Sequence, residues 1–377
     1  MERFKRPAQQ LVLFLLTLVT TTFAGSELCF GKSILLPGYS FADFWQGMSY
    51  SLPFLGILSV HEFGHYFAAR YHRVKTSLPW YIPFYLPWIF PFSIGTLGAL
   101  IRLRERVPSL TKNFDIGIAG PLAGFVAALG VLAYGFTHLP EPTWIYTIHP
   151  EYQKFGLDYA KYVYEPGFME GSIGLMFGDN ILFHLMSVTL ADPARMPNPH
   201  ELIHYPYLLA GFLSLVFTAL NLMPIGQLDG GHVVYGLFGS RGHRLTAISV
   251  FLMFVFFAGL GTVTPAMSSD SMIFGVPLYI GFLYLTFTGL QLDWRNTLIL
   301  TLVVFLIQYG ITWFFPAVTG FGSWLVFAFV LGRFIGVYHP LAMVEEPLST
   351  GRKVLGWIAL LILVLCFTPA PIQFSGY

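Results

Sequence analysis

The stretch Ile57-Leu-Ser-Val-His-Glu-Phe-Gly-His-Tyr-Phe-Ala-Ala-Arg-Tyr71 is largely apolar, yet it holds two histidines and a glutamate at its centre. Residues four apart on a helix lie on the same face, so His61 and His65 can offer two imidazoles to one metal ion. Glu62 is turned by about 100° and can reach a water at that metal without being a ligand. Zinc suits this set, because it takes nitrogen ligands and keeps one position open at catalytic sites. It would bring the pKa of that water toward about 7, and Glu62 would take the proton during attack on a carbonyl.

The surroundings of this motif favour a functional interpretation. The residues from Met48 to Val60 carry no charge. Imidazoles and a carboxylate inside a hydrophobic helix are costly unless they have a role. The alternative is that His61 and His65 are satisfied core histidines, which would be our default for a single histidine but not for the whole pattern.

The composition indicates a polytopic membrane protein. Of the 377 residues, 55% are hydrophobic and only 10% are charged, whereas soluble proteins have roughly 25% charged residues. The net charge of +1 and the lack of a basic patch interleaved with aromatic residues argue against a nucleic-acid partner. Cys29 and Cys366 predict neither a disulfide framework nor a cysteine metal cluster.

The apolar segments predict an all-α polytopic fold with roughly eight or nine transmembrane helices. The motif helix is predicted at Phe41–Tyr71, and further helices at Ile116–Phe136, Leu202–Leu222, Leu245–Val263, Ile273–Leu292, Thr297–Phe315, Ser323–Val337 and Val354–Pro369. Threading these spans leaves four of the twenty Lys and Arg residues on one side, namely Lys32, Lys154, Lys161 and Arg195. The opposite, basic side is therefore predicted to be cytoplasmic.

Three regions follow from this topology. Residues 1–40 are predicted to form an N-terminal apolar helix or a cleaved, signal-like segment, because the basic Met1–Pro7 precedes the apolar run Leu11–Phe23. Residues 41–240 form the predicted core, with an acidic extracytoplasmic loop at 138–201, and residues 241–377 form C-terminal transmembrane helices. Within the loop, Ile173–Leu190 predicts an interfacial or loop helix.

The segment Leu78–Leu100 is apolar but contains Pro79, Pro83, Pro87 and Pro91. Proline disrupts helix hydrogen bonding, and irregular backbone at membrane depth occurs only where protein or a wet cavity surrounds it. We therefore expect a re-entrant, β-like segment beside the active site, with Ser93–Ile101 extended. Its free edge could pair with an extended substrate. The alternative is an irregular packing loop.

A second motif, Asn221-Leu-Met-Pro-Ile-Gly-Gln-Leu-Asp-Gly-Gly-His232, interrupts another apolar helix. Asp229 is a carboxylate in an apolar setting and could be the third metal ligand that two histidines lack. Asn221 could hold a substrate carbonyl or orient a strand, and His232 could be a hydrogen-bond partner of the metal ligands. By itself, Asp229 would more often be a capping or turn residue, and its pairing with the first motif reverses this preference.

These two motifs together resemble the site-2 protease family of intramembrane zinc metalloproteases, as do Gly95-Thr-Leu-Gly98 and Asn113–Gly124. The resemblance covers roughly Leu52–Phe238 and is greatest for the plastid-type branch and bacterial relatives that lack a PDZ domain. It implies one Zn²⁺ per chain bound by His61, His65 and Asp229, catalysis by Glu62, and substrate binding by Asn221, Gly95 and Gly98.

The implied function is hydrolysis of peptide bonds within or near transmembrane segments of membrane proteins, as in regulated intramembrane proteolysis. The expected partners are transmembrane protein substrates and the lipid bilayer, with an accessory or upstream protease as a further candidate. The expected location is the cytoplasmic membrane of a bacterium, with an organellar membrane as the alternative. Two other functions fit less well: a divalent-metal transporter, which would carry ligands on more helices, and a silent chaperone-like relative, which would have lost a ligand or the glutamate.

Overall fold

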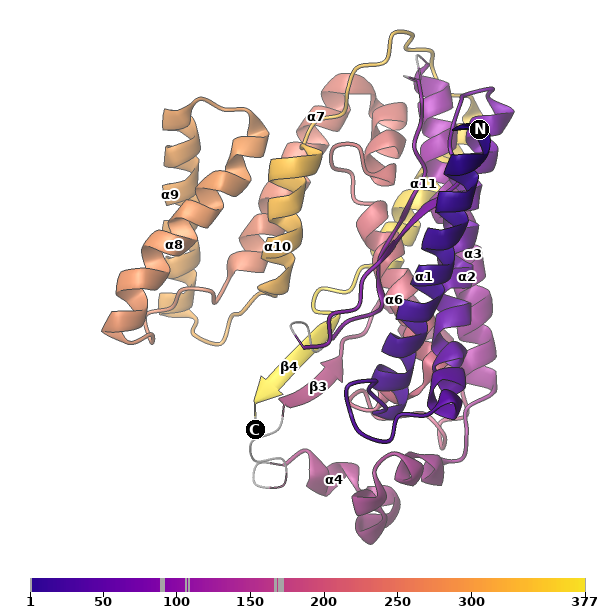
Figure 1. Ribbon diagram of the computed structural model, residues 1–377. Helices are drawn as coiled ribbons and strands as arrows, with labels where there is room; N and C mark the ends of the chain where they lie inside the picture. The colour runs from indigo at the N-terminus through magenta and orange to yellow at the C-terminus, as the bar shows by residue number, and fades with distance from the viewer. Residues whose placement is uncertain are drawn as a thin grey trace. The chain divides into compact units, whose positions relative to one another are not determined.

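The computed structural model describes residues 2–88, 92–105, 107, 109–165, 168 and 173–376 (Figure 1). Pro91, which belongs to the predicted re-entrant segment, lies outside the described part. The described chain is mostly helical and has two small antiparallel sheets. It divides into two compact units. Unit 1 comprises Met1–Arg106, Ala119–Leu220 and Leu361–Tyr377, and unit 2 comprises Val107–Ile118 and Asn221–Leu360.

Unit 1 contains the motif helix and the long loop. Its helices are α1 (Glu2–Phe30), α2 (Phe41–Tyr71), most of α3 (Leu110–Thr137), η1 (Pro142–Thr147), η2 (Pro150–Asp158), α4 (Ala160–Val163), α5 (Ile181–Leu190), η3 (Leu202–His204) and α6 (Pro206–Asn221), and its strands are β1 (Trp80–Pro83), β2 (Thr96–Leu100), β3 (Ile173–Phe177) and β4 (Ile372–Gly376). Helices α1 and α2 pack along each other, and β1 lies against α1.

Helix α2 begins and ends at the predicted residues. Ser40 caps its first turn by accepting a hydrogen bond from the amide of Asp43, and the Asp43 carboxylate accepts from the amide of Ser40 in return. This reciprocal capping box satisfies two amides that would otherwise lack partners. The helix is 31 residues long, and His61, Glu62 and His65 of its motif are buried.

The predicted extended segment is confirmed as strand β2, which pairs antiparallel with β1. Leu100 lies opposite Trp80 and Ala99 opposite Tyr81, and an irregularity follows Tyr81. This sheet has only these two strands within the described residues. The second edge of β2 is therefore left without a strand partner in that part of the chain.

The helix predicted over Ile173–Leu190 is wrong in its first half. Residues Ile173–Phe177 form β3, which pairs with β4 near the C-terminal end of the chain, and the helix α5 begins only at Ile181. Asn180 caps α5 by accepting a hydrogen bond of 2.9 Å from the amide of Phe183. A partner strand far along the chain therefore determines the conformation of Ile173–Phe177.

Unit 2 contains the second motif and the later helices. These are α7 (Asp229–Gly259), α8 (Ser269–Phe287), η4 (Thr288–Leu290), α9 (Trp294–Phe314), α10 (Ser323–Val330), the π-helical turn η5 (Leu331–Ile335) and most of α11 (Thr350–Cys366). Helices α8 and α9 pack together as neighbours, and α10 packs against α7 (Figure 1). Asp115 and Arg352 form a bidentate ion pair, with N–O distances of 2.7 and 2.8 Å, that joins the start of α3 to α11.

Five helical segments of the described chain are long and apolar enough to cross a membrane: Pro7–Phe30, Leu110–Thr137, Asp229–Gly259, Ser269–Leu290 and Trp294–Phe314. The protein is accordingly an integral membrane protein with a mostly helical fold. The larger predicted number of spanning helices is not confirmed. The motif helix α2 is not among the five although it is long enough, because its polar residues lower its mean hydropathy.

Candidate functional site

The two motif histidines lie together on the buried side of α2. The Nε2 atoms of His61 and His65 are 3.1 Å apart, and both side chains are buried. Two nitrogen ligands at about 2.0–2.1 Å from one tetrahedral ion lie about 3.3 Å apart. The imidazole pair therefore has the spacing that a shared metal ion requires.

Two glycines of α3 leave the room that these imidazoles occupy. A Cβ atom at Gly120 would lie 2.1 Å from Nε2 of His65, and a Cβ at Gly124 would lie 2.9 Å from the Cβ of His61. Any larger residue at Gly120 would push the His65 ring out of place. Small residues four apart permit the close approach of another helix, but the sequence analysis missed that Gly120 and Gly124 shape the imidazole site.

The β1–β2 hairpin is fixed to the motif helix close to Glu62, which is itself buried. The hydroxyl groups of Ser59 and Tyr81 are 2.7 Å apart and join α2 to β1. Another hydrogen bond runs from the Tyr50 hydroxyl to the carbonyl of Ile94, just before β2. The extended segment is therefore held on the helix that contains the His-Glu-x-x-His motif.

The two glycines of the extended segment differ in their surroundings. Gly95 has a φ of +88°, and a Cβ there would lie 2.3 Å from the Cα of Thr21. Its carbonyl accepts a hydrogen bond of 2.8 Å from the Thr20 hydroxyl, so close packing on α1 explains this glycine. Gly98 has a φ of +106° and open space where a Cβ would be, and the neighbouring Leu97 is 64% exposed.

The second motif forms a tight turn at the start of α7 in unit 2. Asp229 is the first residue of this helix, and Asn221 is the last residue of α6. A Cβ at Gly230 would lie 1.8 Å from the carbonyl oxygen of Leu222, and one at Gly231 would lie 2.3 Å from that of Gly226. Both glycines are thus required for the turn to pack against the helix.

His232 has a histidine partner that the sequence did not reveal. Its Nδ1 atom lies 2.8 Å from Nε2 of His339, whose Nδ1 lies 2.6 Å from the Pro340 carbonyl. Since a carbonyl only accepts, Nδ1 of a neutral His339 donates to it and Nε2 accepts from Nδ1 of His232. In the neutral form of His232, its Nε2 then carries no hydrogen. Burial lowers the pKa of His339. Because 107 residues separate the two histidines, no local pattern indicated the pair.

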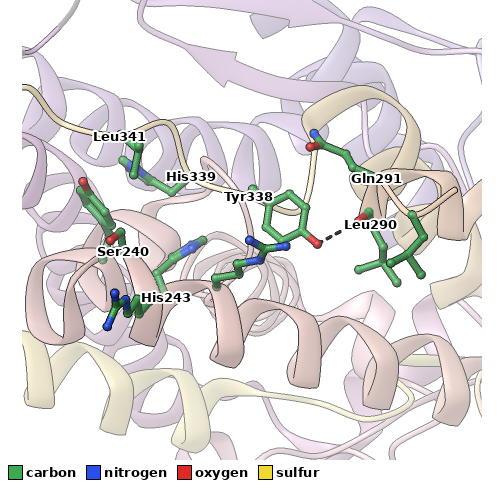
Figure 2. Close-up of a pocket in the computed structure, with 11 residues that line it drawn as sticks. Ser240, His243, Leu290, Gln291, Tyr338, His339 and Leu341 are labelled. Atoms are coloured by element: carbon green, nitrogen blue, oxygen red, sulfur yellow. Dashed lines mark hydrogen bonds between the residues drawn. The ribbon is translucent and has the colours of Figure 1, made fainter.

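A cavity of about 420 Å³ in unit 2 lies beside this histidine pair (Figure 2). His339 lines it together with His243, Arg241 and Arg244. The guanidinium group of Arg244 lies 5.2 Å from the ring centre of Tyr338, whose hydroxyl donates a hydrogen bond of 2.9 Å to the Leu290 carbonyl. The cavity is thus basic and aromatic in character.

Comparison with known proteins gives relatives with named activities. The protein named "Probable zinc metalloprotease EGY1, chloroplastic" of Arabidopsis thaliana is 30% identical over 215 residues, which are 57% of this chain and 34% of that protein. The EGY1 protein of Oryza sativa subsp. japonica is 29% identical over 201 residues, 52% of this chain and 30% of its own. EGY2 of Arabidopsis thaliana is 25% identical over 198 residues, again 52% and 30%. The chain thus spans about a third of the length of these relatives, and no solved structure matches it.

The family comparison covers both motifs. The model of peptidase family M50 matches residues 49–260, which are more than half of the chain and include the His61–His65 turn and Asp229. This match confirms the resemblance to the site-2 proteases that the motifs predicted. The chain belongs to peptidase family M50.

Proposed function

We propose that this protein is a zinc-dependent intramembrane endopeptidase that cleaves transmembrane protein substrates within the bilayer. The observation that carries the proposal is the buried pair of Nε2 atoms, 3.1 Å apart, next to a buried glutamate on the same helix. Family membership and the named zinc metalloproteases among the relatives support it. The five apolar helices support a membrane setting.

We assign the protein ligands of the zinc to His61, His65 and Asp229. The space left by Gly120 and the 3.1 Å spacing fit the two imidazoles to one ion. Asp229 supports the assignment by its place in the second motif, where Gly230 and Gly231 hold the turn that begins α7. Two nitrogens and one carboxylate oxygen leave a fourth position for water or substrate.

Glu62 would act as the general base and acid. When bound, zinc would lower the pKa of a water and polarise the carbonyl of the scissile bond. Glu62 follows His61 directly and is rotated away from the ligand face, so its carboxylate would take a proton from the attacking water. It would then pass this proton to the leaving amine, which completes hydrolysis.

The free edge of β2 would hold the substrate in an extended form. A substrate helix must unwind locally before its peptide bond can reach the site, and pairing with a strand edge would satisfy its backbone groups. Gly98 leaves open space on this strand, and Leu97 and Leu100 are exposed beside it. Asn221 would assist by holding a substrate carbonyl. Gly95 would act indirectly, because it packs on α1.

The proposal is tested by separating metal binding from chemistry. Wild type, Glu62→Gln and His61→Ala are purified in detergent, and zinc per chain is measured with cleavage of single-span model substrates. We expect Glu62→Gln to keep its zinc and lose cleavage, and His61→Ala to lose one zinc per chain and cleavage. His184→Ala is the matched control, because His184 is an exposed histidine outside the motif. Cleavage that persists in Glu62→Gln would refute the assignment.

A further inference from the structure

A second group of metal-binding side chains lies in unit 1, at the two ends of the long loop. His149 directly precedes η2, Glu201 directly precedes η3, and His204 ends η3. Each offers a ligand atom, and these atoms lie within 4.8 Å of one another. They are well outside the motif helix in the sequence, and the proposed peptidase function does not use them.

The mutual distances match the ligand sphere of one small ion. The Nε2 atoms of His149 and His204 are 3.2 Å apart. Oε2 of Glu201 lies 3.8 Å from the first nitrogen and 3.5 Å from the second. Tetrahedral zinc with ligands at about 2.0–2.1 Å places neighbouring ligand atoms about 3.3 Å apart. All three distances are close to this value.

The opposite atom of each side chain is held by a partner, as is usual around metal sites. Nδ1 of His204 lies 2.9 Å from the carbonyl oxygen of Cys29, and Nδ1 of His149 lies 3.1 Å from Oε1 of Glu151. Oε1 of Glu201 accepts a hydrogen bond from the Tyr164 hydroxyl. Metal-binding histidines commonly donate their other nitrogen to a backbone carbonyl or a carboxylate in this way.

The hydrogen bonds at Nδ1 of His149 and His204 explain why a cation is needed between their Nε2 atoms and Glu201. The Cys29 carbonyl and the Glu151 carboxylate only accept, so Nδ1 of each imidazole carries the hydrogen. In their neutral forms, His149 and His204 therefore direct two Nε2 lone pairs toward each other at 3.2 Å. The Glu201 carboxylate, 2% exposed, adds a buried negative charge, and in the described chain the basic side chains within 4 Å of it are these two imidazoles, which carry no charge in their neutral forms. A buried carboxylate of this kind requires a positive partner.

We propose that His149, Glu201 and His204 bind a second divalent metal ion of the zinc type, distinct from the ion of the peptidase motif. Two imidazoles and one carboxylate suit zinc, and the fourth position is open because the side chain of His149 is 29% exposed. The ion joins the first part of the loop to its last turn, and through the Cys29 carbonyl it also fixes the end of α1. Its role is to hold together the two chain segments that flank the short helices around α4 (Figure 1).

The test counts zinc in a protein whose motif site has been removed. In the His61→Ala/His65→Ala double variant, full-length protein in detergent is equilibrated with micromolar zinc, desalted and assayed for zinc per chain. We expect about one zinc to remain, as for a single site. Adding His149→Ala should bring it close to zero, whereas adding His184→Ala should leave it unchanged. His184 is a fair control because it also lies 3.1 Å from a carboxylate, that of Asp179, in the same loop.

A second variant keeps the proposal testable if His149→Ala fails to fold. Glu151→Gln removes no ligand and changes only the partner of His149 Nδ1, so it should weaken zinc binding about 10- to 100-fold while one zinc still binds at saturation. Zinc affinity is measured by competition with a chelator. Absence of zinc from the double variant, or binding that survives His149→Ala, would overturn the proposal. Absence of zinc would mean that a proton, not a metal, joins the two imidazoles. Because both motif histidines are missing in every variant, the result is independent of the peptidase proposal.

Discussion

Replacing Gly120 by alanine tests whether α3 shapes the imidazole site. The new Cβ would lie 2.1 Å from Nε2, 2.4 Å from Cδ2 and 2.5 Å from Cε1 of His65, whereas ordinary contacts begin at 3.4 Å. The ring or the helix must therefore shift by about 1.3 Å. A misplacement of about 1 Å can cost on the order of 100-fold in rate, or about 2.7 kcal/mol of transition-state stabilisation. We expect at least this loss of cleavage, together with weaker zinc binding.

Two further glycines of the same helix provide a graded series. Gly124→Ala brings a Cβ to 2.9 Å from the Cβ of His61, a smaller overlap that should cause a smaller loss. Gly130→Ala meets nothing within 4 Å and should leave cleavage unchanged. Alanine favours the helix over glycine by about 1 kcal/mol, so none of the three changes weakens α3 itself. The assays are turnover of a single-span substrate and zinc per chain. Gly120→Ala protein with wild-type turnover and zinc content would refute the argument.

Two other predictions concern unit 2. Arg352→Lys should lower the free energy of unfolding of the detergent-purified protein by about 1 kcal/mol, because lysine cannot make the bidentate contact with Asp115. A Tm equal to that of wild type would contradict this prediction. The free energy of unfolding should also fall as the pH drops below about 6.5, the ordinary pKa of histidine. Burial lowers the pKa of His339 in the folded protein, so below this pH the unfolded chain binds more protons than the folded one. His339→Gln should reduce this loss between pH 7.5 and 5.5 in thermal unfolding, and an unchanged pH dependence would exclude His339 as its source.

The motif helix could be predicted because its determinants are local. Ser40 and Asp43 form a capping box three residues apart, and the largely apolar segment behind them stays helical as far as Tyr71. The extended segment could also be predicted, since prolines exclude a helix there and the glycines permit a strand. The spacing of His61 and His65 follows from helix geometry alone.

The remaining features depend on contacts between distant parts of the chain. The glycines after Asp229 gave no reason to predict a helix before Leu245, yet α7 begins at Asp229 because Gly230 packs closely on the preceding turn. His149 and His204 are 55 residues apart, and neither belongs to a metal-binding motif of recognisable spacing. The sequence therefore contained no indication of a second metal site. The role of Gly120 was hidden for the same reason, since His65 approaches it from another helix.

The pairing of β3 with β4 has a consequence for biosynthesis. Ile173 lies opposite Gly376, so this sheet of unit 1 joins residues that are separated by nearly all of unit 2 in the chain. A ribosome must add the helices α7 to α11 before β4 exists, and contacts of such long sequence separation form slowly. Strand β3 consequently has no β4 to pair with while the later helices are synthesised. Unit 1, which contains the peptidase motif, becomes complete only after unit 2 has been synthesised.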